Sequence, residues 1–322
     1  MRRGAIATLV IALTMCAPAA AATRQTTDQP DDLTDHQQVH VMYVVPKDGT
    51  DRGLDENGTV ESSVASWQQW LRGQTGGLGM NLDTASGQLD VTFVRLSVTT
   101  AQVAAKGAYV NNEIGKRLKL AGFDAPNKVY LVYYDAPVHP GSCGDGAWPP
   151  AAPGKVAAIY LHGELPEGIP PCDSNPLAGP GDPPGYFEFV GLHEVMHTLG
   201  FVPRCAPNET RDGHVSDSPT DLMYAGDEPW DPQVLDFGRD DYFKAGRRGC
   251  LDLAGSGYLE NGPTFSCVTA RDAVAGDKRA LTSARAALKR AHTTRARARA
   301  RARIDTANRK LRQDRKRAAG AC

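Results

Sequence analysis

The chain has 322 residues, of which 41% are hydrophobic and 23% are charged. This composition excludes a wholly disordered chain and allows one large globular domain with an appendage. The net charge of −1 hides an asymmetry: residues 271–322 contain 17 Lys/Arg and 4 Asp/Glu, a net charge of +13, so the rest of the chain carries −14. We therefore expect an acidic body joined to a basic extension.

The N-terminal residues have the pattern of a secretory signal. A basic start precedes an apolar stretch at residues 5–15, and small residues follow at 20–22. The apolar stretch is short for a bilayer span. We predict a signal peptide at residues 1–22 and a secreted protein, extracellular or associated with the cell envelope, with no transmembrane segment in its mature chain. The polar residues 23–37 that follow are predicted to be a disordered linker.

Six cysteines remain after the signal, and an even number in an exported chain favours disulfide bonds. The chain has no CxxC pair, which argues against a zinc site made of cysteines. Pairing by proximity along the chain predicts three bridges, although sequence alone does not choose among the possible pairings. The predicted bridges are Cys143–Cys172, Cys205–Cys250 and Cys267–Cys322.

Hydrophobic patterns predict alternating strands and helices from residue 38 onward. The predicted strands are 39–45, 88–96, 128–136 and 155–163, and the predicted helices are 59–73, 99–122 (one helix or two) and 186–200. Strands that alternate with helices favour an α/β domain with a largely parallel sheet. We place this domain at residues 38–265.

The last predicted helix carries the pattern HEVMH. His193 and His197 are four residues apart, so their rings project from one helix face and can share a metal ion. Glu194 lies beside the first histidine, where its carboxylate can hold a water molecule and accept its proton. Gly200 is a natural end for the helix, because glycine adopts the left-handed conformation without a Cβ penalty.

The longer pattern HExxHxxG, which ends at Gly200, resembles the metzincin superfamily of zinc peptidases. A second resemblance is the stretch from Asp221 to Tyr224 (DLMY), which is similar to the methionine-containing turn of that superfamily. The resemblance implies a twisted, mostly parallel sheet with an antiparallel edge strand, which we assign to residues 155–163. It also makes Met223 a platform under the metal rather than a ligand.

The third metal ligand departs from the metzincin pattern. The position expected for it, three residues past the glycine, is Pro203, and proline cannot bind a metal. We prefer His214, delivered by an inserted loop that Cys205 helps to hold, since three histidines leave one coordination position open. Asp217 and Asp221 are the alternatives, and Asp217 could instead orient a ligating histidine.

The resemblance implies hydrolysis of peptide bonds. Zn²⁺ would be the cofactor and would activate a water molecule, with Glu194 as the general base and an extended protein or peptide substrate along the edge strand. Tyr224 is a candidate donor to the developing oxyanion, whereas we expect His162 to be structural. Two alternatives stay open: a non-catalytic exported protein that keeps the zinc fold and binds an anionic cell surface, and a zinc hydrolase of non-peptide amides.

Residues 266–322 form the basic extension and include RARARARAR at 295–303. Alanine and arginine are good helix formers, so we expect one long helix, a helical pair or a disordered tail. Its charge favours attachment of residues 271–322 to an anionic cell-envelope surface. Specific nucleic-acid binding is not expected, because no recognition motif is present and residues 271–322 lack aromatic residues.

Overall fold

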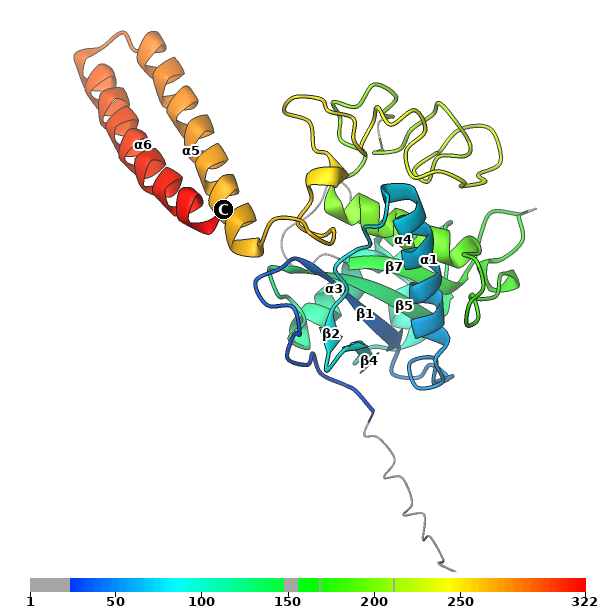
Figure 1. The fold of residues 1–322 in the computed structure, drawn as a ribbon. Helices are drawn as coiled ribbons and strands as arrows, with labels where there is room; N and C mark the ends of the chain where they lie inside the picture. The colour runs from blue at the N-terminus through cyan, green and yellow to red at the C-terminus, as the bar shows by residue number, and fades with distance from the viewer. Residues whose placement is uncertain (1–23, 148–155, 168, 211) are drawn as a thin grey trace, which may run out of the picture.

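The computed structural model describes residues 24–147, 156–167, 169–210 and 212–322. The predicted signal peptide at residues 1–22 lies outside the described residues. Over the described part, the fold is the predicted α/β arrangement with a mostly parallel sheet, which confirms the predicted class (Figure 1).

Five strands form the main sheet in the order β4-β1-β5-β7-β6. Neighbouring strands are parallel except for β6, which is antiparallel to β7. The strands are β1 (Gln38–Val45), β4 (Val91–Arg95), β5 (Lys128–Val138), β6 (Gly144–Gly146) and β7 (Val156–Gly163), and a separate small hairpin is formed by β2 (Thr84–Ala85) and β3 (Gln88–Leu89). The α-helices are α1 (Thr59–Thr75), α2 (Thr100–Ala104), α3 (Val110–Leu120), α4 (Tyr186–Leu199), α5 (Phe265–Arg290) and α6 (Thr294–Ala321). Short 3₁₀ helices lie at Gly107–Tyr109, Cys172–Ser174 and Leu253–Gly255.

Helices cover both faces of the sheet, which explains why its central strands are apolar on both sides. In β1, Val39, Val41 and alternate residues after them pack with Trp67 of α1 and Leu192 of α4. The intervening residues, such as Met42, pack on the other face against the α2 and α3 side chains. Helix α4 is therefore held directly against the sheet, and it carries the predicted metal motif.

The antiparallel edge strand exists, but our assignment of it to residues 155–163 is wrong. That segment forms β7, which pairs with β5 on one side and with β6 on the other. The edge strand is β6, Gly144–Gly146. Its three residues include two glycines and no apolar side chain, so no hydrophobic pattern marks it in the sequence.

The predicted strand at 88–96 is divided in two. Asp90 separates β3 from β4, and its buried carboxylate accepts the backbone N–H of Gln29 at 2.8 Å. The contact of Asp90 with Gln29, a residue outside the strand, thus interrupts the alternating hydrophobic pattern that predicted one continuous strand.

Residues 24–37 are not the disordered linker that we predicted for 23–37. They contain no helix or strand, yet side-chain contacts fix them against the sheet. The Arg24 guanidinium lies 3.5 Å from the Phe93 ring centroid and donates hydrogen bonds to the carboxylates of Asp51 and Asp55. Composition alone suggested disorder because these charges had no visible partners in the sequence.

A buried ammonium group attaches the same segment near the start of β5. Lys128 Nζ donates to Asp28 at 2.7 Å, to Asp31 at 2.7 Å and to Asp83 at 2.6 Å. His40 also donates its Nδ1 hydrogen toward the Asp83 carboxylate at 2.5 Å. This network compensates charges that would otherwise be costly to bury.

All three predicted disulfide pairings are present, with S–S distances of 2.03–2.14 Å. The basic extension is ordered as a helical pair, α5 and α6, whose open end is tied by Cys267–Cys322. In the described part of the chain, no helix is both long enough and apolar enough to cross a bilayer.

Candidate metal centre

The first turn of helix α4 contains a buried carboxylate, Glu188, which accepts hydrogen bonds from three segments. Glu188 accepts the hydroxyl of Ser63 on α1 at 2.6 Å, the N–H of Ala178 at 3.0 Å and the N–H of Gly185 at 2.9 Å. A carboxylate in the first turn also interacts favourably with the helix dipole. The helix ends at Gly200, whose φ of +96° is the left-handed conformation expected there. Both ends of the metal-motif helix are thus fixed.

Two histidines of α4 are oriented by main-chain carbonyl groups. Nδ1 of His193 donates to the carbonyl oxygen of Leu222 at 2.7 Å, and Nδ1 of His197 donates to that of Phe201 at 3.2 Å. These contacts assign the Nδ1 hydrogen in each ring, so Nε2 is the atom suited to bind a metal. Sequence motifs do not reveal such partners, because they are carbonyl groups of other residues.

His214 reaches the same place from a loop between Gly200 and the turn at residues 221–224. Its carbonyl oxygen accepts the N–H of Thr210 at 2.8 Å, and the neighbouring N–H of Val215 donates to Met223 at 2.9 Å. The disulfide Cys205–Cys250 fixes the start of this loop. The loop is therefore attached at one end through sulfur and at the other to the turn that we compared with the methionine turn.

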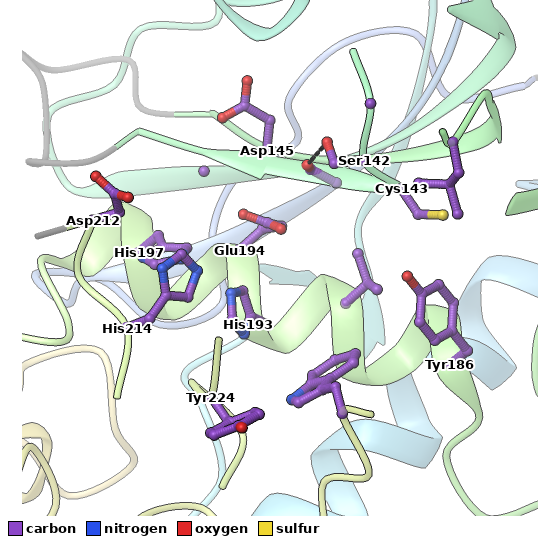
Figure 2. Close-up of a pocket in the computed structure, with 16 residues that line it drawn as sticks. Ser142, Cys143, Asp145, Tyr186, His193, Glu194, His197, Asp212, His214 and Tyr224 are labelled. Atoms are coloured by element: carbon purple, nitrogen blue, oxygen red, sulfur yellow. Dashed lines mark hydrogen bonds between the residues drawn. The ribbon is translucent and has the colours of Figure 1, made fainter. Parts of the chain in front are cut away.

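The three imidazoles meet on one side of α4 (Figure 2). Nε2 of His197 and Nε2 of His214 are 3.0 Å apart, and one nitrogen of each ring, His193 included, lies within 4.8 Å of the others. Nitrogen ligands about 2.0–2.1 Å from a tetrahedral zinc ion would be about 3.3 Å apart. The spacing therefore fits three ligands of one ion.

Burial keeps these rings in the form that binds metals. It lowers the pKa of His193 to about 3, lowers the pKa of His197 well below its usual value, and lowers the pKa of His214. All three imidazoles are neutral near pH 7, as metal ligation requires. Each neutral ring has one unprotonated nitrogen, and that nitrogen can bind a metal cation.

The two alternative ligands lie elsewhere. Asp221 is fully buried, and its carboxylate accepts the N–H of Met223 at 2.7 Å, the N–H of Phe237 at 2.6 Å and the hydroxyl of Tyr242 at 3.0 Å. It therefore holds together the turn at residues 221–224, the backbone of Phe237 and the Tyr242 side chain. Met223 itself is fully buried in the core.

Asp217 is exposed and belongs to a different acidic group, with Asp240 and Asp241. One of its oxygens accepts the side-chain amide of Asn208 at 3.3 Å. The structure brings His214, and neither aspartate, to the two helix histidines.

Glu194 lies between the histidines and the edge strand β6 (Figure 2). Burial and the nearby Asp145 raise its pKa well above the usual value for glutamate, while a hydrogen bond from the Gly146 N–H opposes this rise. Asp145 points to the other side of the strand, and burial raises its pKa to about 6.

Strand β6 can lie this close to α4 only because Gly144 and Gly146 have no side chains. A Cβ atom on Gly144 would lie 2.6 Å from Val190, and one on Gly146 would lie 2.4 Å from the main-chain oxygen of Glu194. Glycine at the alternate positions 144 and 146 is the sequence signal that could have identified this strand, because alternate residues of a strand face the same side.

The site opens into a cavity of about 620 Å³. Tyr186 and Trp230 form an aromatic wall on one side, with ring centroids 5.9 Å apart, and the Trp230 indole N–H donates to the Leu222 carbonyl that also holds His193. Sequence reasoning missed both aromatic residues, because nothing in the local pattern distinguishes them from core side chains.

Tyr224 also lines the cavity, on the side of the histidines opposite Glu194 (Figure 2). Its hydroxyl accepts the N–H of Glu228 at 3.2 Å. His162 is outside the cavity and bonds the Asp135 carboxylate at 2.8 Å, in agreement with the expected structural role.

A second histidine–carboxylate group, formed by Asp28, His40, Asp83 and Asp90, differs in kind. The Lys128 ammonium already bonds two of its carboxylates. The positive charge in this second group is thus supplied by the Lys128 side chain.

No protein-family model matches the chain, and neither does any curated protein at a significant level.

Proposed function

We propose that the protein is a secreted metal-dependent hydrolase that cleaves peptide bonds. The observation that carries the proposal is the convergence of His214 with His193 and His197, next to Glu194, in one open cavity. The chain supplies this third histidine despite Pro203, through a loop held by a disulfide. Three disulfides suit an oxidising compartment outside the cytosol, which supports the proposed localisation.

Zn²⁺ is the metal that the donor set fits best. Three neutral imidazole ligands with an open fourth position are typical of catalytic zinc sites. A zinc ion bound there would polarise a substrate carbonyl and acidify a water molecule. The carbonyl groups of Leu222 and Phe201 would keep two of the ligands in their binding orientation.

Glu194 is the proposed general base. It follows His193 in the same helix and lines the cavity that contains the three histidines, so its carboxylate lies beside the place where a metal-bound water would be. The Gly146 N–H holds the carboxylate in place, at the rim of the cavity that a substrate would enter. A base held in this way would take the proton of an attacking water and pass it to the leaving amine.

The proposed substrate is an extended protein or peptide segment along β6. This strand ends the sheet, and an exposed strand edge can pair with an added peptide through main-chain hydrogen bonds. Tyr186 and Trp230 would contact a side chain of that segment. Tyr186 and Tyr224 are the two phenols available to donate to the oxyanion, and burial together with Glu194 raises the pKa of Tyr186, which keeps its proton in place.

The alternative is a non-catalytic zinc-fold protein that binds an anionic cell surface through residues 271–322. Only the net charge of residues 271–322 supports the surface-binding part of this alternative. The position of Glu194 in the histidine cavity favours catalysis, since metal binding alone needs no carboxylate there.

The test compares Glu194→Gln with the exposed control Glu164→Gln. We expect Glu194→Gln to keep one zinc per chain and to lose hydrolysis of an unfolded protein substrate by on the order of 10²–10⁴-fold. The control should keep both properties. Zinc binding without turnover in the wild type would favour the non-catalytic alternative, and activity on small amides alone would favour a non-peptide hydrolase.

A further inference from the structure

Helices α5 and α6 form a hairpin that stands out from the body, with its connection at the far end (Figure 1). At its base, Asp35 accepts the N–H and hydroxyl of Ser266 at 2.9 and 2.6 Å, and Cys267–Cys322 closes the two helices. Leu281 and Leu311 are buried between the helices. The apolar side chains of the hairpin are thus used for its own packing.

Positive charge is concentrated toward the tip. Residues 285–304 contain eight Lys/Arg and no Asp/Glu. The carboxylates of the hairpin lie outside this range, and two of them are buried: Asp277 pairs with Lys310, and Asp314 pairs with Arg317. The tip, defined as residues 285–304, therefore has cations without internal partners of opposite charge.

The tip arginines surround α6 rather than forming one stripe. They occur at every second position from Arg295 to Arg303, so successive arginines are about 200° apart around the helix. All of them are exposed, and no ion pair in the described part of the chain joins them to a carboxylate. Charges on opposite sides of a rod cannot all touch a flat surface at once.

The side chains of the tip also exclude other modes of binding. No large hydrophobic residue is exposed in the described hairpin, so a lipid bilayer would find no apolar anchor. The tip has no Phe, Tyr or Trp on which bases could stack, and its one ring is the exposed imidazole of His292. Arginine predominates over lysine, and its planar guanidinium binds phosphate oxygens in a bidentate manner.

We propose that the hairpin tip binds a linear phosphate polymer through its backbone charges. A flexible chain with one negative charge per phosphate can wrap around α6 and reach arginines on both sides. Recognition would depend on phosphate spacing and not on bases or lipid tails. This inference is independent of the proposed hydrolysis, because it concerns a separate part of the molecule.

The experiment measures binding of the full chain to inorganic polyphosphate by fluorescence anisotropy. The tip variant changes five arginines to glutamine, and a base variant removes the same charge about 20 Å away along the helices. Glutamine has a similar helix propensity, so circular dichroism should show unchanged helicity. The tip set is Arg295→Gln, Arg297→Gln, Arg299→Gln, Arg301→Gln and Arg303→Gln. The base set is Lys278→Gln, Arg279→Gln, Arg312→Gln, Arg315→Gln and Lys316→Gln.

Wild-type affinity should fall about 100-fold between 50 and 200 mM salt if about five phosphates are contacted. The tip variant should bind at least about 100-fold more weakly at 50 mM salt, and the base variant should stay within about tenfold. Equal losses in the two variants would show that only net charge matters and would overturn the proposal. So would binding to phosphatidylglycerol vesicles or to a single-stranded oligonucleotide in the absence of polyphosphate binding.

Discussion

Replacing Gly146 by alanine should disturb the contact between β6 and α4 through a single added methyl group. The added Cβ would lie 2.4 Å from the main-chain oxygen of Glu194 and 2.8 Å from Cβ of His197. Neither atom can rotate away, because both are fixed by the α4 backbone. The strand must therefore move by roughly 0.5–1 Å, and overpacking of this kind destabilises a protein by about 1–3 kcal/mol.

The movement has a second consequence, because the Gly146 N–H bonds the Glu194 carboxylate. If Glu194 is the base, a displacement near 1 Å should lower turnover by up to about 10²-fold. Gly73→Ala is the matched control: its Cβ would have no neighbour within 4 Å in α1, so it should stabilise by about 0.5–1 kcal/mol. Urea unfolding of both variants gives the comparison. A Gly146→Ala protein as stable as the wild type would refute the close approach of strand and helix.

Three further outcomes are expected. His214→Ala should abolish tight zinc binding, while Asp217→Asn changes it little, and a zinc titration in which only Asp217→Asn loses the metal would reverse the ligand assignment. Lys128→Met should destabilise by about 3–5 kcal/mol in urea, because it leaves buried carboxylates uncompensated, whereas the exposed Lys119→Met should have almost no effect. Burial raises the pKa of Asp236 to about 6, so its stabilising protonated form is complete below about pH 4 and is lost as the pH rises through 6. The unfolding free energy of the wild type relative to Asp236→Asn should therefore fall by about 1–3 kcal/mol between about pH 4 and pH 7, and a constant difference would contradict this reasoning.

The features that sequence predicted well are those with local or strongly periodic signals. The helix around His193 and His197 combines a four-residue spacing with a glycine stop, and the structure has both. The buried strands are recognisable from continuous apolar runs such as residues 41–45 (VMYVV) of β1. The disulfide pairings agreed because the six cysteines pair consecutively along the chain, the first with the second, the third with the fourth and the fifth with the sixth.

The features that sequence could not predict depend on distant partners. Strand β6 has no pattern of its own and exists because its glycines fit against α4. Arg24 lies in a segment whose composition suggests disorder, but its side chain bonds carboxylates that are more than 25 residues away in the chain. The orienting contacts of His193 and His197 go to carbonyl groups, which every residue has. Only the folded chain selects which carbonyl group is used.

The length of the hairpin keeps the charges at its tip electrostatically separate from the body of the protein. Helix α5 has 26 residues, and the tip begins about 30 Å along it from the base, since each helical residue advances about 1.5 Å. Charges at physiological ionic strength are screened over about 8 Å. The arginines of the hairpin tip therefore exert almost no field on the cavity around Glu194. If the cavity takes a charged substrate, the nearby Asp145 and Asp212 act on its charge, whatever the hairpin tip has bound.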